Sequence, residues 1–196
     1  NQKSYVLLEN YKENKTVWEN EDCSIIDIGD GILNIEFNSK MNTIGSGILQ
    51  GLNKAIEIGE KNFQGLIIGN EGDNFSAGAD LGMIFMMSVE QEYKELNIAI
   101  KYFQETMMKL RYSNIPTIAS PHGLTLGGGC ELCMHADKVV AAAETYIGLV
   151  EFGVGLIPGG GGTKEMTLRT SESFKKNDVE LNILRESFLN IAMAKV

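Results

Sequence analysis

The sequence is poor in cysteine, and its few cysteines do not suit a cross-link or a metal site. The chain of 196 residues has three, Cys23, Cys130 and Cys133. An odd number without regular spacing does not make a disulfide framework. Cys130 and Cys133 form one Cys-x-x-Cys pair in a helical run near His135, and no second pair completes the four ligands of a zinc site. We therefore expect buried structural thiols and no metal.

Positive charge is also scarce. Lysine and arginine total 17 against 26 acidic residues, which gives a formal net charge of −9. This balance argues against a general surface for nucleic acid or an anionic membrane. It leaves room for an anionic ligand, because the amides of glycine turns bind anions without lysine.

Long apolar runs and targeting signals are absent from the sequence. No segment approaches the roughly 18 apolar residues of a membrane span. The chain begins at Asn1 without a signal-peptide pattern, so we expect a cytoplasmic protein and an excised fragment or processed chain.

Nucleotide-binding motifs are missing as well. No Gly-x-Gly-x-x-Gly occurs, so the chain has no dinucleotide site of its own. The cluster Gly159 to Gly162 lacks the Lys-Ser/Thr ending of a phosphate-binding P-loop. We expect no cofactor in this chain.

The most informative stretch is Pro116 to Thr163. An apolar run meets three glycines, Gly127 to Gly129, and a helical run follows with Glu131 in its first turn. A second acid, Glu151, precedes the second glycine cluster. Backbone N–H groups at such turns can hold an oxyanion while carboxylates move protons. The alternatives are that the glycines only make a tight turn and that the glutamates lie on the surface.

Length and periodicity predict one α/β domain. Residues 24–38 predict a β-hairpin around Asp30-Gly31, and Asn42-Thr43 can cap the helix that follows. A long helix is expected from Val89 to Leu110, with one apolar face on the core. Further strands are expected at 64–69, 116–120, 138–142 and 144–151, and further helices at 127–136, 162–168 and 181–191. Residues 1–22 are polar without a sustained period, which predicts a linker or poorly ordered lead-in.

A second motif, Phe75 to Leu81 (FSAGADL), precedes the central stretch. In order and spacing the two motifs resemble the crotonase (enoyl-CoA hydratase/isomerase) superfamily over roughly residues 24–168. The likeness is strongest to the hydratase half of bifunctional 3-hydroxyacyl-CoA dehydrogenase/enoyl-CoA hydratase proteins. It implies a crotonase-type α/β spiral of ββα units at 23–196 that lacks the usual C-terminal helical region.

The resemblance also implies a site. The backbone amides of Ala79 and Gly128 would hold the thioester oxygen of a CoA substrate, and Glu131 and Glu151 would hold a water molecule between them. The substrate-binding positions that it implies are Ala77, Gly78, Asp80, Leu81, Gly127, Gly129, Pro158 and Gly159.

The implied reaction is syn hydration of 2-enoyl-CoA to 3-hydroxyacyl-CoA in fatty-acid β-oxidation. Two alternatives stay open: an enoyl-CoA isomerase, which generally needs one of the two acids, and a non-catalytic assembly domain of a dehydrogenase fusion. The implied partners are acyl-CoA, a covalently linked dehydrogenase domain that would hold NAD, and a homotrimer. His122 is expected to lie in a turn or on the surface, and Met83, Met86 and Met87 either line an acyl pocket or fill the core.

Overall fold

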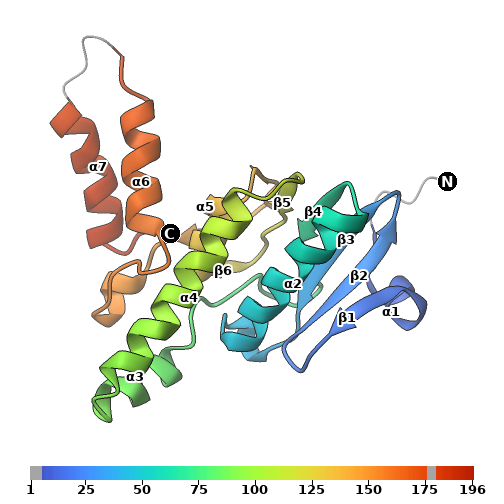
Figure 1. Cartoon of the computed structure of the whole chain (residues 1–196). Helices are drawn as coiled ribbons and strands as arrows, with labels where there is room; N and C mark the ends of the chain where they lie inside the picture. Colours follow the sequence, from blue (N-terminus) through green and yellow to red (C-terminus); the bar gives the residue numbers. More distant parts are fainter. Residues whose placement is uncertain (1–5, 176–179) are drawn as a thin grey trace.

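The computed structural model describes residues 6–175 and 180–196 (Figure 1). The helices are α1 (Glu9–Lys15), α2 (Ser46–Asn62), α3 (Leu81–Val89), α4 (Tyr93–Arg111), α5 (Gly128–His135), α6 (Gly162–Glu172) and α7 (Glu180–Ala192), with short 3-10 helices η1 (Lys40–Asn42) and η2 (Glu151–Val154). The strands are β1 (Thr16–Glu19), β2 (Cys23–Gly29), β3 (Ile32–Phe37), β4 (Gly65–Ile68), β5 (Thr117–Ala119), β6 (Leu124–Leu126), β7 (Lys138–Val139) and β8 (Tyr146–Gly148).

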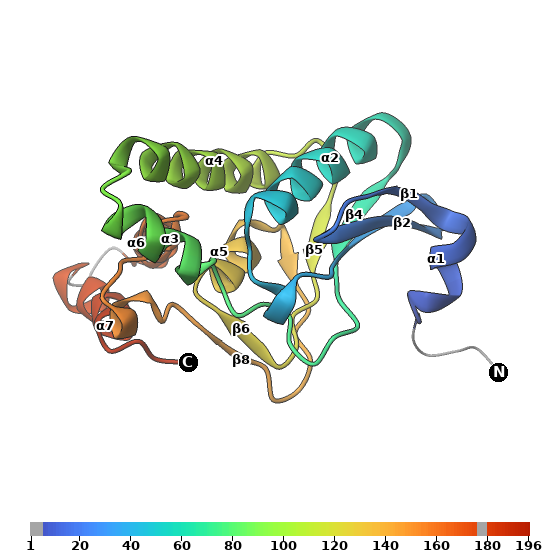
Figure 2. The same ribbon diagram turned by 90° about the horizontal axis from the view of Figure 1, so that it is seen from below.

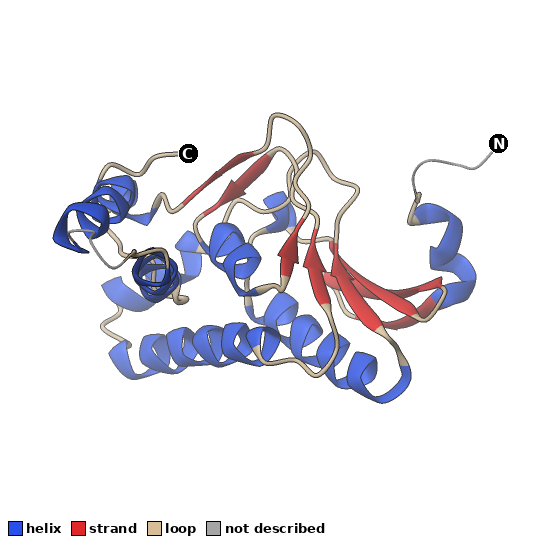
Figure 3. Cartoon of the chain, turned by 90° about the horizontal axis from the view of Figure 1, so that it is seen from above, coloured by secondary structure: helices blue, strands red, loops and turns tan. Residues whose placement is uncertain are grey.

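Two sheets organise the chain. The larger has six strands in the order β1-β2-β3-β4-β5-β7, antiparallel from β1 to β3 and parallel from β3 onward. The smaller is the parallel pair β6–β8. Helix α2 packs on β2, β3 and β4, and α4 lies beside α2 (Figure 2). Helix α5 lies between α4 and the β6–β8 pair (Figure 3), so its N-terminus is enclosed by both layers.

The predicted hairpin is confirmed as β2–β3. Asp30 and Gly31 at its turn have φ of 53° and 74°, and two positive φ values are what a type I′ turn requires. Ile25, Leu33 and Ile35 on its arms are fully buried. The turn and the apolar alternation are both local signals, which is why the sequence alone locates this element.

The expectation of a poorly ordered lead-in is wrong for residues 9–19. They form α1 and β1, and β1 adds an antiparallel edge strand to β2, with Trp18 opposite Ile25. Lys12 in α1 also reaches Glu36 on β3, with 3.0 Å between Nζ and Oε2. The edge of β2 offers unpaired backbone groups that another strand can satisfy, and this need is not visible in the polar composition of the lead-in.

The start of α2 differs from the prediction. Its N-cap position is Gly45, which makes no side-chain cap bond. The Thr43 hydroxyl donates to the Lys40 carbonyl at 3.1 Å, and the Asn42 side-chain amide donates to the Asn74 carbonyl at 3.0 Å. Asn42 therefore joins this loop to the loop at Asn74, Thr43 bonds within its own turn, and neither side chain caps the helix. The apolar stripe itself is confirmed as buried, at Ile44, Ile48, Leu52, Ala55 and Ile56.

The predicted helix from Val89 to Leu110 is confirmed as α4, although it begins later, at Tyr93; α3, which ends at Val89, was not predicted. The chain breaks between α3 and α4, where Gln91 takes a positive φ of 58°. The C-terminal half of α4 is buried on the core, whereas Val89 and Tyr93 are 60% and 61% exposed. In Figure 1, α3 and the start of α4 project beyond the sheet, so their apolar side chains have no layer to pack on. No residue of α3 is buried, so its methionines do not fill the core.

The remaining predicted elements are present; the strands and α5 are shorter than predicted, whereas α6 and α7 are longer. The four later strands appear as β4, β5, β7 and β8, and the helices as α5, α6 and α7. Helices α6 and α7 pack side by side (Figure 1). Within the described residues, every helix is too short or too polar to cross a membrane.

Candidate active site

The turn between β6 and α5 places the candidate site. Gly127 occupies the N-cap position of α5 with φ 51° and ψ −118°, a conformation that glycine adopts readily. Its N–H donates to the Gly148 carbonyl at 2.9 Å. A Cβ on Gly127 would lie 3.2 Å from Glu151 Oε1. The end of β8 and the second acid are therefore held directly against this turn.

Two backbone amides meet at the same turn. A Cβ on Gly128 would lie 3.2 Å from the backbone nitrogen of Ala79, and one on Gly78 would lie 3.5 Å from that of Gly128. Among the described residues, neither the Ala79 nor the Gly128 N–H donates to a protein acceptor. The Gly128 N–H also belongs to the first turn of α5, where the helix dipole favours negative charge. Two neighbouring free donors are suited to binding an oxyanion.

Ser76 supports the Ala79 side of this pair, and sequence reasoning missed it. Its hydroxyl accepts the Gly78 N–H at 3.1 Å and donates to the Asn42 carbonyl at 2.7 Å. A Cβ on Gly129 would lie 2.8 Å from Ser76 Cβ. Gly129 thus lets α5 approach the Ser76 loop closely. A serine in a loop motif gives no sign of these contacts before the fold is known.

Glu131 projects from the first turn of α5 and is 3% exposed. Its Oε1 accepts the Gly162 N–H at 2.7 Å, and a Cβ on Gly160 would lie 2.5 Å from Oε2. Burial raises the pKa of Glu131 to about 7; the amides of Gly162, Gly160 and Gly161 oppose this, and the nearby Glu151 adds to it. The second glycine cluster, Gly159 to Gly162, therefore packs directly against this carboxyl group.

Glu151 begins η2, shortly after β8 ends at Gly148. Both of its carboxylate oxygens are buried, and neither has a hydrogen-bond partner in another described residue. Burial raises the pKa of Glu151, with an opposing effect of its own backbone N–H. A buried carboxyl group without a partner is costly, so this arrangement is typical of a site that binds a ligand or moves a proton.

The other predicted residues lie around this centre with different partners. Asp80 caps α3 by accepting the Met83 N–H at 3.1 Å, and Leu81 is 46% exposed. The Ala77 N–H donates to the Met41 carbonyl at 3.1 Å. These residues flank the amide pair and do not reach the two carboxylates.

Pro158 and Gly159 precede α6. The Pro158 carbonyl accepts from the Thr163 hydroxyl at 3.1 Å, and the Gly159 carbonyl accepts from the Gln104 side chain at 2.7 Å. Both contacts fix the loop that carries the amides to Glu131. Their expected role in substrate binding remains a prediction.

The cysteines are free and buried. Burial raises the pKa of Cys130 to about 12, and the carboxylates of Glu151 and Glu131 add to the shift. No group of three metal-binding side chains occurs in the described ranges. His122 lies in a loop, with Nε2 2.6 Å from the Gly72 carbonyl oxygen.

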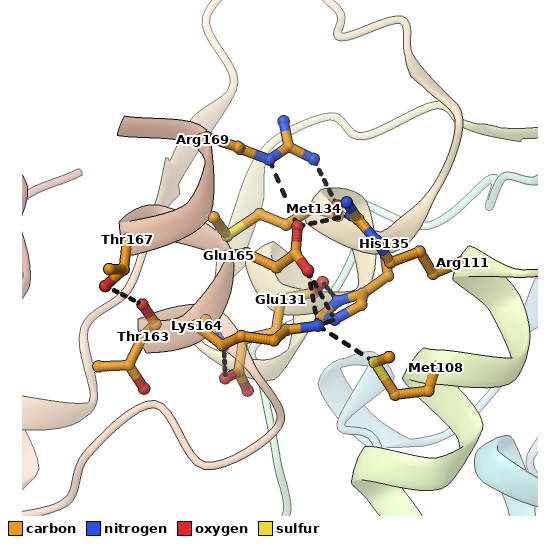
Figure 4. A network of polar contacts seen from close by, with 11 residues as sticks. Met108, Arg111, Glu131, Met134, His135, Thr163, Lys164, Glu165, Thr167 and Arg169 are labelled. Carbon is orange, nitrogen blue, oxygen red and sulfur yellow. Dashed lines mark hydrogen bonds and ion pairs between the residues drawn. The ribbon is translucent and has the colours of Figure 1, made fainter. Parts of the chain in front are cut away.

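Sequence reasoning also missed a buried charged network behind Glu131. Glu165 is fully buried and is surrounded by Arg111, His135 and Lys164 (Figure 4). In the sequence Glu165 lies four residues before Arg169, a spacing that is typical of a surface ion pair on a helix. Only the packing of α4, α5 and α6 brings the residues of the network together.

A comparison with models of known protein families identifies the family of this chain. The family model described as "Enoyl-CoA hydratase/isomerase" matches residues 27–175. The chain belongs to the enoyl-CoA hydratase/isomerase family. This confirms the resemblance that the FSAGADL and GGGCE motifs suggested.

Two curated relatives of this family member are much longer. A Bacillus subtilis (strain 168) protein named "Probable 3-hydroxyacyl-CoA dehydrogenase" is 46% identical over 99% of this chain and 24% of its own length. A Rickettsia felis protein named "Putative fatty acid oxidation complex trifunctional enzyme" is 37% identical over 81% of this chain and 22% of its own length. The chain thus spans about a quarter of the length of these relatives.

Solved structures show the same fold. An enoyl-CoA hydratase from Polaromonas sp. JS666 has a TM-score of 0.75 at 21% identity, over 88% of this chain and 63% of that one. One from Bacillus anthracis has a TM-score of 0.68 at 28% identity, over 76% of this chain and 58% of that one. The predicted α/β crotonase-type fold is confirmed, and the chain matches part of the solved chains.

Proposed function

We propose that this chain adds water in syn geometry to 2-enoyl-CoA and forms 3-hydroxyacyl-CoA. The observation that carries the proposal is the pair of buried carboxyl groups, Glu131 and Glu151, on either side of a turn with two free amides. Family membership supports this class of reaction. The arrangement of donors and acids favours hydration within it.

The amides of Ala79 and Gly128 would bind the thioester oxygen. When hydroxyl adds to C3 of the enoyl group, the electron pair of the C2–C3 double bond moves toward that oxygen and forms an enolate. Two preorganised donors stabilise this charge, and losing one in a comparable site costs roughly 2.7–4 kcal/mol. The turn glycines permit close approach because no Cβ stands in the way.

The two glutamates would handle the water. One carboxylate takes a proton from the water as its oxygen attacks C3, and a proton is delivered to C2 on the same face, so one water molecule is added in total. A general acid or base works best when its pKa lies near the working pH. The pKa of about 7 for Glu131 suits this role. The unpartnered oxygens of Glu151 suit contact with the same water.

An isomerase is the second candidate. Isomerases of the family that the sequence resembles generally need only one of these two acids to move a double bond. Here the carboxyl groups of both acids are buried beside the turn. The presence of both favours hydration. A non-catalytic assembly role fits these features less well, because it gives the buried Glu151 oxygens no use.

The names of the longer relatives support a wider setting for the reaction. We propose that the chain serves fatty-acid β-oxidation in the cytoplasm and is linked covalently to an NAD-dependent dehydrogenase. We also propose that the protein forms a homotrimer and that this chain itself binds no cofactor.

Product analysis tests the assignment. The chain is incubated with 2-butenoyl-CoA in heavy-oxygen water, and with 3-butenoyl-CoA in a parallel reaction, and the products are identified by mass spectrometry. Hydration predicts 3-hydroxybutyryl-CoA with the heavy oxygen at C3. Conversion of 3-butenoyl-CoA to 2-butenoyl-CoA without hydration would assign an isomerase, and binding without any product would assign a non-catalytic role.

A further inference from the structure

Glu165 is a buried charge that the proposed reaction does not use. It lies in the first turn of α6, and its side chain is fully buried. Arg111 from α4 lies 2.6 Å from Oε2, and Lys164 lies 2.7 Å from Oε1 (Figure 4). Arg169, one helical turn further on, lies 3.6 Å from Oε2. Burial alone raises the pKa of Glu165, but the hydrogen bond and charge of Lys164 and the charge of Arg111 outweigh it and lower the pKa, so the group is a carboxylate.

The Lys164 ammonium bridges this charge to His135 on α5, the helix that carries Glu131. The Nδ1 atom of His135 lies 2.7 Å from the backbone carbonyl oxygen of Glu131, and a carbonyl only accepts, so Nδ1 carries the hydrogen. Nε2 faces Lys164 at 3.3 Å and Glu165 at 3.6 Å. Burial lowers the pKa of His135, although the Glu131 carbonyl and Glu165 oppose this, and Lys164 and Arg111 add to the lowering. The ring is therefore neutral, with its Nε2 lone pair toward the Lys164 ammonium.

The same ring touches the glycine loop at the start of α6. A Cβ on Gly161 would lie 2.9 Å from His135 Cε1, and Gly161 has a φ of 119° that favours glycine. The next residue, Gly162, donates its N–H to Glu131. The network thus holds the first turn of α6 against α5 and α4. This is the turn whose Gly162 N–H donates to the Glu131 carboxyl group.

We propose that Glu165 is a positioning residue that, through Arg111 and through the Lys164 ammonium that bridges it to His135, holds the start of α6 so that the Gly162 N–H stays on the Glu131 carboxylate. The expected effect on turnover rests on the proposed function. The expected effect on the pKa of Glu131 depends only on the contact between Glu131 and α6. Glu165 does not touch the reacting atoms. It sets how strongly the charged form of Glu131 is stabilised.

Two effects of neutralising Glu165 have opposite signs. Removing a negative charge near Glu131 would by itself lower the pKa of Glu131. Loss of the Gly162 donor would raise it, since a hydrogen bond to the carboxylate favours the charged form. The direction of the change therefore separates positioning from a through-space effect. The other charges and donors facing Glu131 are Glu151 and the amides of Gly160 and Gly161, which are unchanged in the variant.

The test is an NMR titration of the Glu131 carboxyl carbon in protein labelled at glutamate, with Glu131→Gln identifying the signal. We expect a midpoint near 7 in the wild type and a rise of roughly one unit in Glu165→Gln, as for the loss of one hydrogen bond to a charged group. Glu105→Gln is the matched control, because Glu105 forms an exposed ion pair with Lys101 on α4, and it should leave the midpoint in place. Glu165→Asp keeps the negative charge but shortens the side chain, so it changes positioning with little through-space effect; it should also raise the midpoint and serves if Glu165→Gln does not fold.

Turnover provides the second readout. Glu165→Gln should lower kcat on 2-butenoyl-CoA about tenfold with little change in KM, and Arg111→Lys should retain more activity than Arg111→Met. An unchanged or lowered Glu131 midpoint in the folded variants overturns the positioning role. If the wild type does not hydrate 2-butenoyl-CoA, the proposed function fails, while the titration still decides the role of Glu165.

Discussion

The carboxylate of Glu131 accepts a 2.7 Å hydrogen bond from the backbone N–H of Gly162, a residue 31 positions further along the chain. This contact explains the second glycine cluster. A Cβ on Gly160 would stand 2.5 Å from Glu131 Oε2, and one on Gly162 would stand 3.0 Å from Oε1. The glycines therefore let the N-terminus of α6 pack directly against the buried Glu131 carboxyl group, and this packing accounts for them without a phosphate ligand.

Stability should show the cost of burying Glu131. Its pKa is raised in the folded chain from 4.5 to about 7, so the folded state holds the proton more tightly and loses stability as the pH rises between these two values. Gln keeps an oxygen for the Gly162 N–H but carries no charge. Glu131→Gln should therefore raise the free energy of unfolding by about 3 kcal/mol at about pH 8 and by little at about pH 4.

Urea unfolding at both pH values checks this expectation. Glu57→Gln is the comparison, since Glu57 is an exposed carboxylate in α2. If Glu131→Gln is less stable than the wild type at the higher pH, then burying the charged Glu131 carboxylate does not destabilise the fold, and the expectation is wrong.

Gly128 should tolerate no side chain. A Cβ there would lie 3.0 Å from Phe103 Cζ and 3.2 Å from the Ala79 nitrogen, between the two amides of the candidate oxyanion site. Gly128→Ala should lower kcat by about 10²–10³, the loss seen when one oxyanion donor is removed. Gly45→Ala is a suitable control because no atom lies within 4 Å of the added Cβ. Equal activity of the two variants would argue against the amide pair.

The lead-in should contribute to stability through Lys12. Its ammonium lies 3.0 Å from Glu36, whose side chain is 5% exposed. Lys12→Met leaves that carboxylate without its counter-ion and should lower the free energy of unfolding by about 1–3 kcal/mol. Lys61→Met removes an exposed pair with Glu57 at 2.9 Å and should cost less than about 0.5 kcal/mol. Equal denaturant midpoints for the two variants would show that α1 is not anchored.

Local signals in the sequence predicted the elements that depend on few neighbours. The Asp30-Gly31 hairpin and the buried stripe of α2 are examples, because turn chemistry and periodicity determine each of them. The end of the apolar face of α4 could not be predicted, since Tyr93 is exposed only because the sheet stops short of it. Strand β1 was missed for the opposite reason, because a polar segment acquired structure from the edge of β2.

The candidate site divides in the same way. The motifs and their family resemblance led to Glu131, Glu151 and the amide pair. Glu165 was not predicted, because Arg111 lies 54 residues before it and the ion pair forms only when α4 and α6 meet. A pattern of residue types within one helix does not reveal that a carboxylate is fully buried.

The most direct test of the account is hydration of 2-butenoyl-CoA, followed by the ultraviolet loss of the conjugated thioester, for the wild type, Glu131→Gln and Glu151→Gln. Since a positioned acid or base contributes typically 10²–10⁴-fold, each substitution should lower kcat by about that factor while the fold remains intact. Gly45→Ala should match the wild type. Hydration that persists in either glutamine variant would contradict the central claim that the two buried carboxyl groups act together on one water molecule.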